Sequence, residues 1–203
     1  MKNNKIQIDE LSSSISNYAK WISIIGVIGA LLLMGRSMGL DDPSAVHYGK
    51  MKSIQMVLEY IPLWISNLLY FVPYILFFVF LNKSIKKYGK PSSGLIVSYI
   101  VIVAVACLLN IIESDDISVL VLIFGMAGLV LETIIAINLM SNFDGRLKTI
   151  AIIMMIAVVV SMFWLLDIDD TWFVYTVAVI EFLLDYYLFS QFAKLFAGEE
   201  TVL

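Results

Sequence analysis

Three acidic residues lie inside long apolar stretches of the sequence, where their chemistry would be unusual. Glu132, Glu181 and Asp185 each fall within a run of apolar residues long enough to cross a bilayer. A charge at the membrane centre costs at least about 2.5–3.5 kcal/mol unless it is solvated, paired or protonated. The apolar runs contain no Lys, Arg or His at that depth. We therefore expect these carboxyl groups to be protonated, hydrated or bound to a cation.

Helical spacing predicts that the three carboxyl groups share one band of the membrane. Glu181 and Asp185 are four residues apart and so lie on one face of a helix. With a rise of about 1.5 Å per residue from the outer ends at residues 117 and 171, Glu132 lies about 22 Å deep, Glu181 about 15 Å and Asp185 about 21 Å. The band would therefore run from mid-membrane toward the cytoplasmic side. Small residues on the same stripes favour close helix packing: Gly125, Gly128, Ala136 and Ala178. These faces are expected to meet protein rather than lipid.

This band predicts a path or coupling site for a cation or a proton, and Asn110 and Asn138 could add neutral oxygen ligands. A structural role is the alternative. Tyr186 and Tyr187 could mark the membrane interface, which would place Asp185 at the headgroups. Glu132 and Glu181 could be protonated and hydrogen-bonded between helices. The sequence leaves both interpretations open.

The elements that must position these residues are predicted to be transmembrane helices. Hydrophobic residues make up 61% of the 203-residue chain and charged residues 15%, which is far more apolar than a typical soluble domain. Apolar runs bounded by charged or turn residues predict an all-α bundle of six transmembrane helices, near residues 21–39, 62–82, 95–112, 117–140, 149–166 and 171–191. Residues 21–191 would therefore form one domain in the lipid bilayer.

The distribution of Lys and Arg predicts that both termini lie in the cytoplasm. We expect the membrane to be a bacterial-type inner membrane. The basic residues on the inner side are Lys2, Lys5, Lys20, Lys83, Lys86, Lys87, Lys90, Arg146, Lys148 and Lys194, against Arg36, Lys50 and Lys52 outside. The outer turns are acidic and could form a vestibule that concentrates cations. Its residues would be Asp41, Asp42, Glu113, Asp115, Asp116, Asp167, Asp169 and Asp170.

Three segments flank or interrupt these spans. Residues 1–20 are expected to form a cytoplasmic amphipathic helix, with Ile8, Leu11, Ile15, Tyr18 and Ile22 at helical spacing. A second amphipathic stretch predicts an interfacial helix in the first outer loop, through Met51, Ile54, Val57, Leu58 and Ile61. Residues 192–203 would form a short cytoplasmic tail. Pro73 predicts a kink in the second span.

Several classes of function find no support. His47 and Cys107 are single residues of their type, so neither a zinc site nor an internal disulfide is expected. Motifs for nucleotide binding, for a hydrolase nucleophile and for an EF-hand are absent. A net charge of −4 argues against nucleic-acid binding. We expect no enzyme activity, no cofactor and no metal centre.

The sequence therefore favours a small homo-oligomeric channel or pore that conducts cations past Glu132, Glu181 and Asp185. A dimeric transporter coupled to protons or sodium is the first alternative. The second is an accessory, effector or immunity protein. In that case a basic cytoplasmic loop would bind a soluble protein partner or anionic lipid, through Lys83, Lys86, Lys87 and Lys90.

Overall fold

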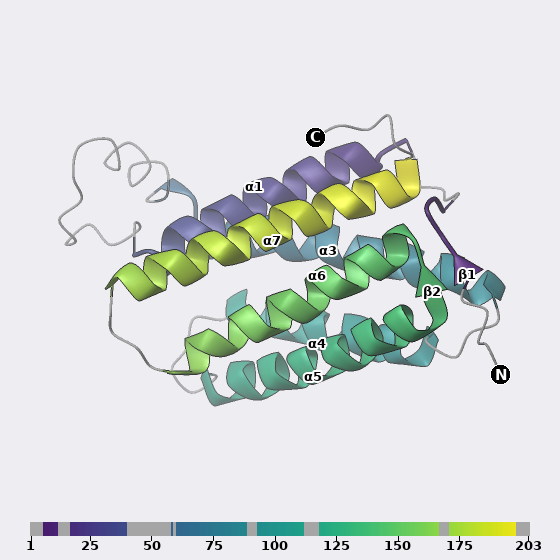
Figure 1. Ribbon diagram of the computed structural model, residues 1–203. Helices are drawn as coiled ribbons and strands as arrows, with labels where there is room; N and C mark the ends of the chain where they lie inside the picture. The colour runs from purple at the N-terminus through teal and green to yellow at the C-terminus, as the bar shows by residue number, and fades with distance from the viewer. Residues whose placement is uncertain are drawn as a thin grey trace.

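The computed structural model describes residues 6–11, 17–39, 58, 60–88, 93–111, 118–166 and 171–197. These parts of the chain form a bundle of long helices joined at one end by a two-stranded pairing (Figure 1). The long helices are α1 (Ala19–Ser37), α3 (Leu63–Ile85), α4 (Ser93–Ile111), α5 (Ser118–Asn142), α6 (Arg146–Ser161) and α7 (Thr171–Ala197). The short elements are β1 (Ile6–Gln7), β2 (Phe143–Asp144) and the 3₁₀ turns η1 (Lys86–Tyr88) and η3 (Met162–Leu166).

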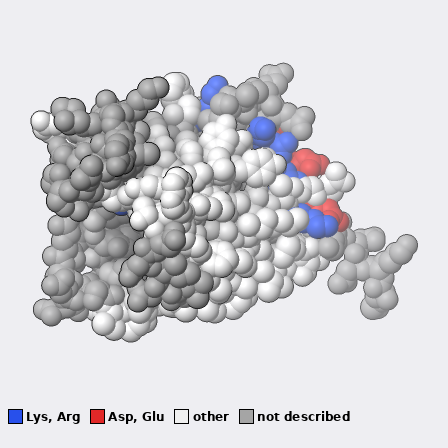
Figure 2. Space-filling model, turned by 60° about the vertical axis from the view of Figure 1, so that its left-hand side comes forward, with Lys and Arg blue, Asp and Glu red and all other residues white. Residues whose placement is uncertain are grey.

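Five of these helices are long and apolar enough to cross a membrane, and a sixth apolar helix, Gly94–Asn110, is shorter. Helices suit this environment because they satisfy every interior backbone hydrogen bond within the segment. Large apolar side chains stay exposed along the sides of the bundle; examples are Ile28, Leu31, Leu122, Ile137 and Leu183. Figure 2 shows a broad uncharged wall between the two ends of the molecule. The architecture is consistent with an all-α membrane protein.

The helices form a closed ring. Successive helices pack side by side from α1 through α3, α4, α5 and α6 to α7, and α7 packs back against α1. Glycines allow the closest approaches of α1 to its neighbours. A Cβ atom on Gly29 would lie 2.4 Å from the backbone nitrogen of Tyr70 in α3, and one on Gly26 would lie 2.5 Å from the ring of Phe189 in α7. Such a ring can enclose a central space, and each helix can contribute side chains to it.

One end of the ring, here called the basic end, collects the positive charge. At this end α1 and α6 begin, and α3 and α7 finish. The described Lys and Arg residues at the basic end are Lys20, Lys83, Lys86, Lys87, Arg146, Lys148 and Lys194. Charged side chains gather there at the right of Figure 2. Among the described cationic residues, Arg36 alone lies at the opposite end, where it bonds to Ser66 and to the carbonyl oxygen of Ile61 at the start of α3.

The predicted amphipathic helix is wrong for residues 6–11, because this segment is extended. β1 pairs in parallel with β2, and the backbone nitrogen of Leu11 donates to the carbonyl oxygen of Leu195 at 2.7 Å. Ile8 and Leu11 are buried, whereas Gln7 and Asp9 are exposed. Asp144 after α5 and Leu195 near the end of α7 accept backbone hydrogen bonds from this extended segment. The same residues in a helix would not reach these carbonyl oxygens. The segment, here called the N-terminal strap, lies across the basic end.

Other boundaries differ from the expectation or fall outside the described residues. α7 continues past residue 191 through Ala197 because Phe192, Leu195 and Phe196 are buried against the bundle. Pro73 lies within α3, and the helix continues on both sides of it. The predicted interfacial helix lies largely outside the described ranges, which include neither residues 51–57 nor residue 59.

Candidate functional site

The centre of the ring contains a cavity of about 430 Å³. Every long helix contributes to its wall: Ala30, Leu33, Met34 and Ser37 from α1, Tyr70, Phe71 and Tyr74 from α3, Tyr99 and Val103 from α4, Leu129 and Glu132 from α5, Ala157, Val158 and Ser161 from α6, and Ala178, Glu181, Phe182, Asp185 and Leu188 from α7. These positions extend from the middle of the bundle toward the end opposite the basic end. The cavity therefore lies between the middle of the bundle and the end opposite the basic end, and Tyr99 marks its limit toward the basic end.

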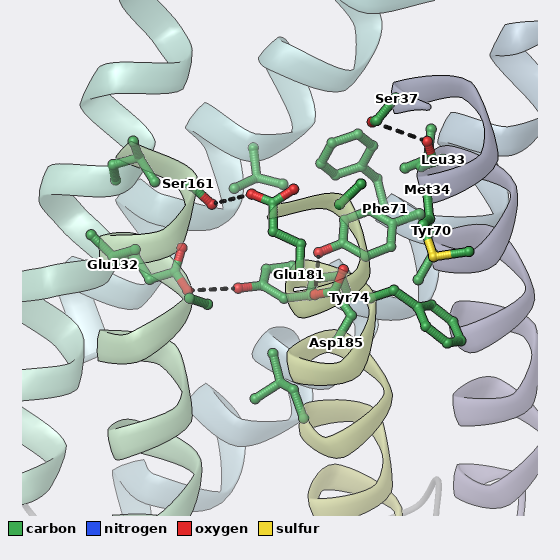
Figure 3. A pocket seen from close by; sticks show the side chains of 18 of the residues that line it. Leu33, Met34, Ser37, Tyr70, Phe71, Tyr74, Glu132, Ser161, Glu181 and Asp185 are labelled. Atoms are coloured by element: carbon green, nitrogen blue, oxygen red, sulfur yellow. Dashed lines mark hydrogen bonds between the residues drawn. The ribbon is translucent and has the colours of Figure 1, made fainter. Parts of the chain in front are cut away.

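All three carboxylates singled out in the sequence line this cavity. Glu132 comes from α5, while Glu181 and Asp185 come from one face of α7. Figure 3 shows the three side chains directed into the same space between the helices. The three carboxylates that helical spacing assigns to one band therefore border one cavity, and their role in ion movement stays a prediction. The small residues Gly128, Ala136 and Ala178 are buried, as predicted for faces that meet protein.

Glu132 forms a triangle of oxygen contacts with two tyrosines. The hydroxyl of Tyr99 donates to Glu132 Oε2 at 2.8 Å, and the hydroxyl of Tyr74 donates to Oε1 at 3.2 Å. The two hydroxyls are themselves 2.9 Å apart. Glu132 is 9% exposed and both tyrosines are less exposed still. This carboxyl group is therefore held in place by α3 and α4 while it borders the cavity.

The two acidic residues of α7 accept hydrogen bonds from neighbouring elements. Tyr70 donates to Asp185 Oδ1 at 2.9 Å, and Ser161 donates to Glu181 Oε1 at 3.1 Å. Both donors belong to neighbouring helices, α3 and α6 (Figure 3). Glu181 also accepts a hydrogen bond from Trp164 of η3, whereas Tyr70 alone is described as a donor to Asp185.

No Lys, Arg or His is among the residues that line the cavity in the described part of the chain. The ionised carboxylates would make its interior strongly negative, and the low dielectric of the membrane would strengthen that field. The compensating positive charge must come from protons or from a bound cation. The cavity is thus suited to attract cations and to exclude anions.

Toward the basic end, the bundle is filled by aromatic side chains. Phe77 and Phe78 of α3 pack against Phe189 and Phe192 of α7, and all four are fully buried. The rings of Phe77 and Phe192 stack with their centroids 4.9 Å apart. These residues follow Tyr74 and Leu188 of the cavity wall along their helices. They form a packed floor between the cavity and the basic end.

Other predicted site residues are not brought to this cavity. Neither asparagine is among its lining residues. Asn110 donates to the carbonyl oxygen of Ala106 in its own helix, and Asn138 accepts from Asn142. The expectation that Gly125 meets protein is wrong, because a Cβ atom there would have no described neighbour within 4 Å.

The predicted outer vestibule lies entirely outside the described residues. In the predicted basic loop, Lys83, Lys86 and Lys87 lie at the basic end, whereas Lys90 also falls outside the described ranges. A docking role for this loop stays a prediction.

The hydroxyl partners of the carboxylates were missed in the sequence. Tyr70, Tyr74 and Tyr99 lie within the predicted spans rather than at their ends, where tyrosine usually marks the interface. Tyr70 and Tyr74 are also four residues apart, the same spacing as Glu181 and Asp185. This pair of hydroxyl donors, spaced like the two carboxylates of α7, was the feature of the sequence that could have identified them.

Within the described ranges, no group of three His, Cys, Asp or Glu residues is arranged to hold a metal ion. The three carboxylates are therefore spread around the wall rather than gathered on one point. No protein-family model, curated protein or solved structure matches the chain. Function must be argued from the cavity itself.

Proposed function

We propose that the chain spans a bacterial-type inner membrane six times, with both termini and the basic end in the cytoplasm. The position of the described Lys and Arg residues supports this orientation, because basic residues near a span resist translocation. α4 supports the sixth span, since it completes the ring between α3 and α5. In this orientation the cavity extends from the middle of the membrane toward its outer side, and the aromatic floor lies between the cavity and the cytoplasm.

Within this topology the protein is a transporter that moves cations through the central cavity by alternating access. The observation that carries the proposal is one cavity, lined by all six helices, that holds three carboxylates and no described cationic side chain. Intramembrane carboxylates of this kind are typical of proton relays and cation-coupling sites. Glu132, Glu181 and Asp185 would exchange protons and cations as the cavity changes its access.

The location of the carboxylates supports a carrier more than a pore between subunits. A pore formed by several copies would place its charged residues on the outer surface of each bundle. Here the carboxylates face the interior of a single ring. The floor of Phe77, Phe78, Phe189 and Phe192 also separates the cavity from the basic end. A carrier is expected to be closed on one side in each of its states.

Flux measurements in proteoliposomes test this function. Purified protein would be reconstituted and its uptake of protons and monovalent cations followed under defined ion gradients and membrane potentials. Wild type is compared with Glu132→Gln, Glu181→Gln and Asp185→Asn. Glu10→Gln is the matched control, because Glu10 is an exposed carboxylate outside the cavity. Equal insertion of every variant is checked by density-gradient flotation.

The expected result is cation flux that saturates with concentration, falls at least tenfold in each cavity variant and is unchanged in Glu10→Gln. Flux that rises linearly with the gradient and depends on the carboxylates would show that the protein is a channel and not a carrier. The absence of flux under every gradient would contradict transport and favour the partner-binding alternative.

A further inference from the structure

We infer that the cavity binds an organic cation, namely a protonated amine or quaternary ammonium group attached to an apolar or aromatic body. This inference names the substrate class and so rests on the proposed transport function. The features that lead to it are the size of the cavity, the spread of its carboxylates and the aromatic character of its wall.

Size separates an organic ligand from a bare ion. A cavity of about 430 Å³ lies within the range of about 300–1,000 Å³ that is common for small-molecule sites. A dehydrated metal ion needs about six oxygen ligands at about 2.0–2.6 Å, which requires a small and converging site. The described residues provide no such cluster. The space is therefore much larger than a metal ion would use.

The carboxylates are arranged to meet a ligand from several sides. Glu132 projects from α5, whereas Glu181 and Asp185 project from α7 on the other side of the space (Figure 3). Their described donors are neutral hydroxyl and indole groups, which position the carboxylates without cancelling their charge. An ammonium group between them would gain electrostatic attraction that no described residue of the protein supplies.

The rest of the wall fits an apolar body. Tyr70 and Tyr74 lie one helical turn apart on α3 with nearly parallel rings, 5.8 Å between centroids, and Phe71 and Phe182 add further aromatic surface. Aromatic faces attract ammonium groups by cation–π interaction within about 6 Å. Leu33, Met34 and Val103 complete an apolar lining. A hydrated inorganic ion would gain nothing from these contacts, whereas an arylalkyl ammonium ion would use both kinds of surface.

Calorimetry with benzyltrimethylammonium tests this assignment. The full-length protein in detergent micelles is titrated with this cation, with its uncharged carbon analogue neopentylbenzene, and separately with Na⁺ and Mg²⁺. Benzyltrimethylammonium is expected to bind at least tenfold more tightly than Na⁺ or Mg²⁺, and neopentylbenzene is expected not to bind. Asp185→Asn should weaken it by at least about 30-fold, as expected when one partner of a buried charge pair is removed. Glu10→Gln, outside the cavity, should leave the affinity unchanged.

Two aromatic variants distinguish a contribution of the cavity wall to ligand binding from a general effect on the fold. Phe71→Leu keeps an apolar side chain on the wall but removes its π face, and should weaken binding about threefold to 30-fold. Tyr88→Leu makes the same kind of change at the basic end, outside the cavity wall, and should not alter binding.

The outcomes distinguish the substrate class from the transport function. If carboxylate-dependent flux of protons or Na⁺ is present but benzyltrimethylammonium neither binds nor competes, the substrate class is wrong and transport stands. If benzyltrimethylammonium binds and Asp185→Asn removes binding, yet no gradient gives flux, the site stands and transport fails. Equal binding of neopentylbenzene would overturn the assignment, because the carboxylates would then have no part in recognition.

Discussion

Removal of the Tyr99 hydroxyl tests the triangle that holds Glu132. The substitution Tyr99→Phe deletes two of its three oxygen contacts, those at 2.8 Å to Glu132 and at 2.9 Å to Tyr74. An interhelical hydrogen bond in a membrane contributes about 0.6 kcal/mol on average and about 1.7 kcal/mol at most. The loss of two should lower the free energy of unfolding by about 1–3 kcal/mol.

The size of this loss also reports the protonation of Glu132. When Glu132 is ionised, the two tyrosine hydroxyls supply only two hydrogens for the three oxygen contacts. A protonated Glu132 adds a third hydrogen, so that each contact has one. The expected 1–3 kcal/mol is the cost for neutral hydrogen bonds. An ionised Glu132 left with one donor would cost about 3–5 kcal/mol, because a buried charge would lose its compensation.

Reversible unfolding by SDS in mixed micelles measures the effect. Tyr186→Phe is the control, since Tyr186 is 38% exposed and has no hydrogen bond to its hydroxyl among the described contacts. It should change stability by less than about 0.5 kcal/mol. Tyr99→Phe is also measured in a Glu132→Leu background, where most of its cost should vanish. A Tyr99→Phe variant as stable as Tyr186→Phe would refute the triangle.

Three further outcomes can be checked by the same unfolding measurement. Gly29→Ala should destabilise by about 1–3 kcal/mol because its Cβ would strike the α3 backbone at Tyr70, whereas Gly125→Ala, with open space around it, should change stability by less than about 1 kcal/mol. Gly145→Ala should cost more than about 1 kcal/mol, since Gly145 has a φ of 77° and borders the N-terminal strap. Asp185→Asn should not destabilise, because the amide oxygen still accepts from Tyr70; a loss above about 2 kcal/mol would favour a structural role for this carboxylate.

The long helices were predictable because apolar length is a strong and local signal. A span must contain about 20 apolar residues, and each helix of the ring coincides with one predicted run. The N-terminal strap was not predicted correctly. Ile8 and Leu11 fit a helical spacing, but Ile6 and Ile8 also alternate with the exposed residues Gln7 and Asp9. The choice of strand depended on backbone partners more than 130 residues away in β2, which no local pattern reveals.

The site was predictable in part for a similar reason. The cost of a charge in a membrane singles out Glu132, Glu181 and Asp185 from the sequence, and helical spacing gives their common depth. Which helices face each other across the cavity depends on the closed order of the ring, and the sequence does not specify that order. Tyr99 could therefore not be paired with Glu132, although both are visible as polar residues within spans. The error for Asn110 is the opposite one. It was predicted to contribute to the site, but its amide donates to a carbonyl oxygen within its own helix.

The contrast between the two halves of the bundle follows from where α3 and α7 place their aromatic residues. Toward the basic end, Phe77, Phe78 and Phe192 meet ring against ring and are fully buried. In the other half the same two helices present Tyr70 and Asp185, whose hydrogen bond keeps polar groups at the surface of the cavity. Transport through this protein would therefore require α3 and α7 to separate at their aromatic contacts. The N-terminal strap, which joins the end of α7 to the turn before α6, crosses the end of the bundle where that separation would occur.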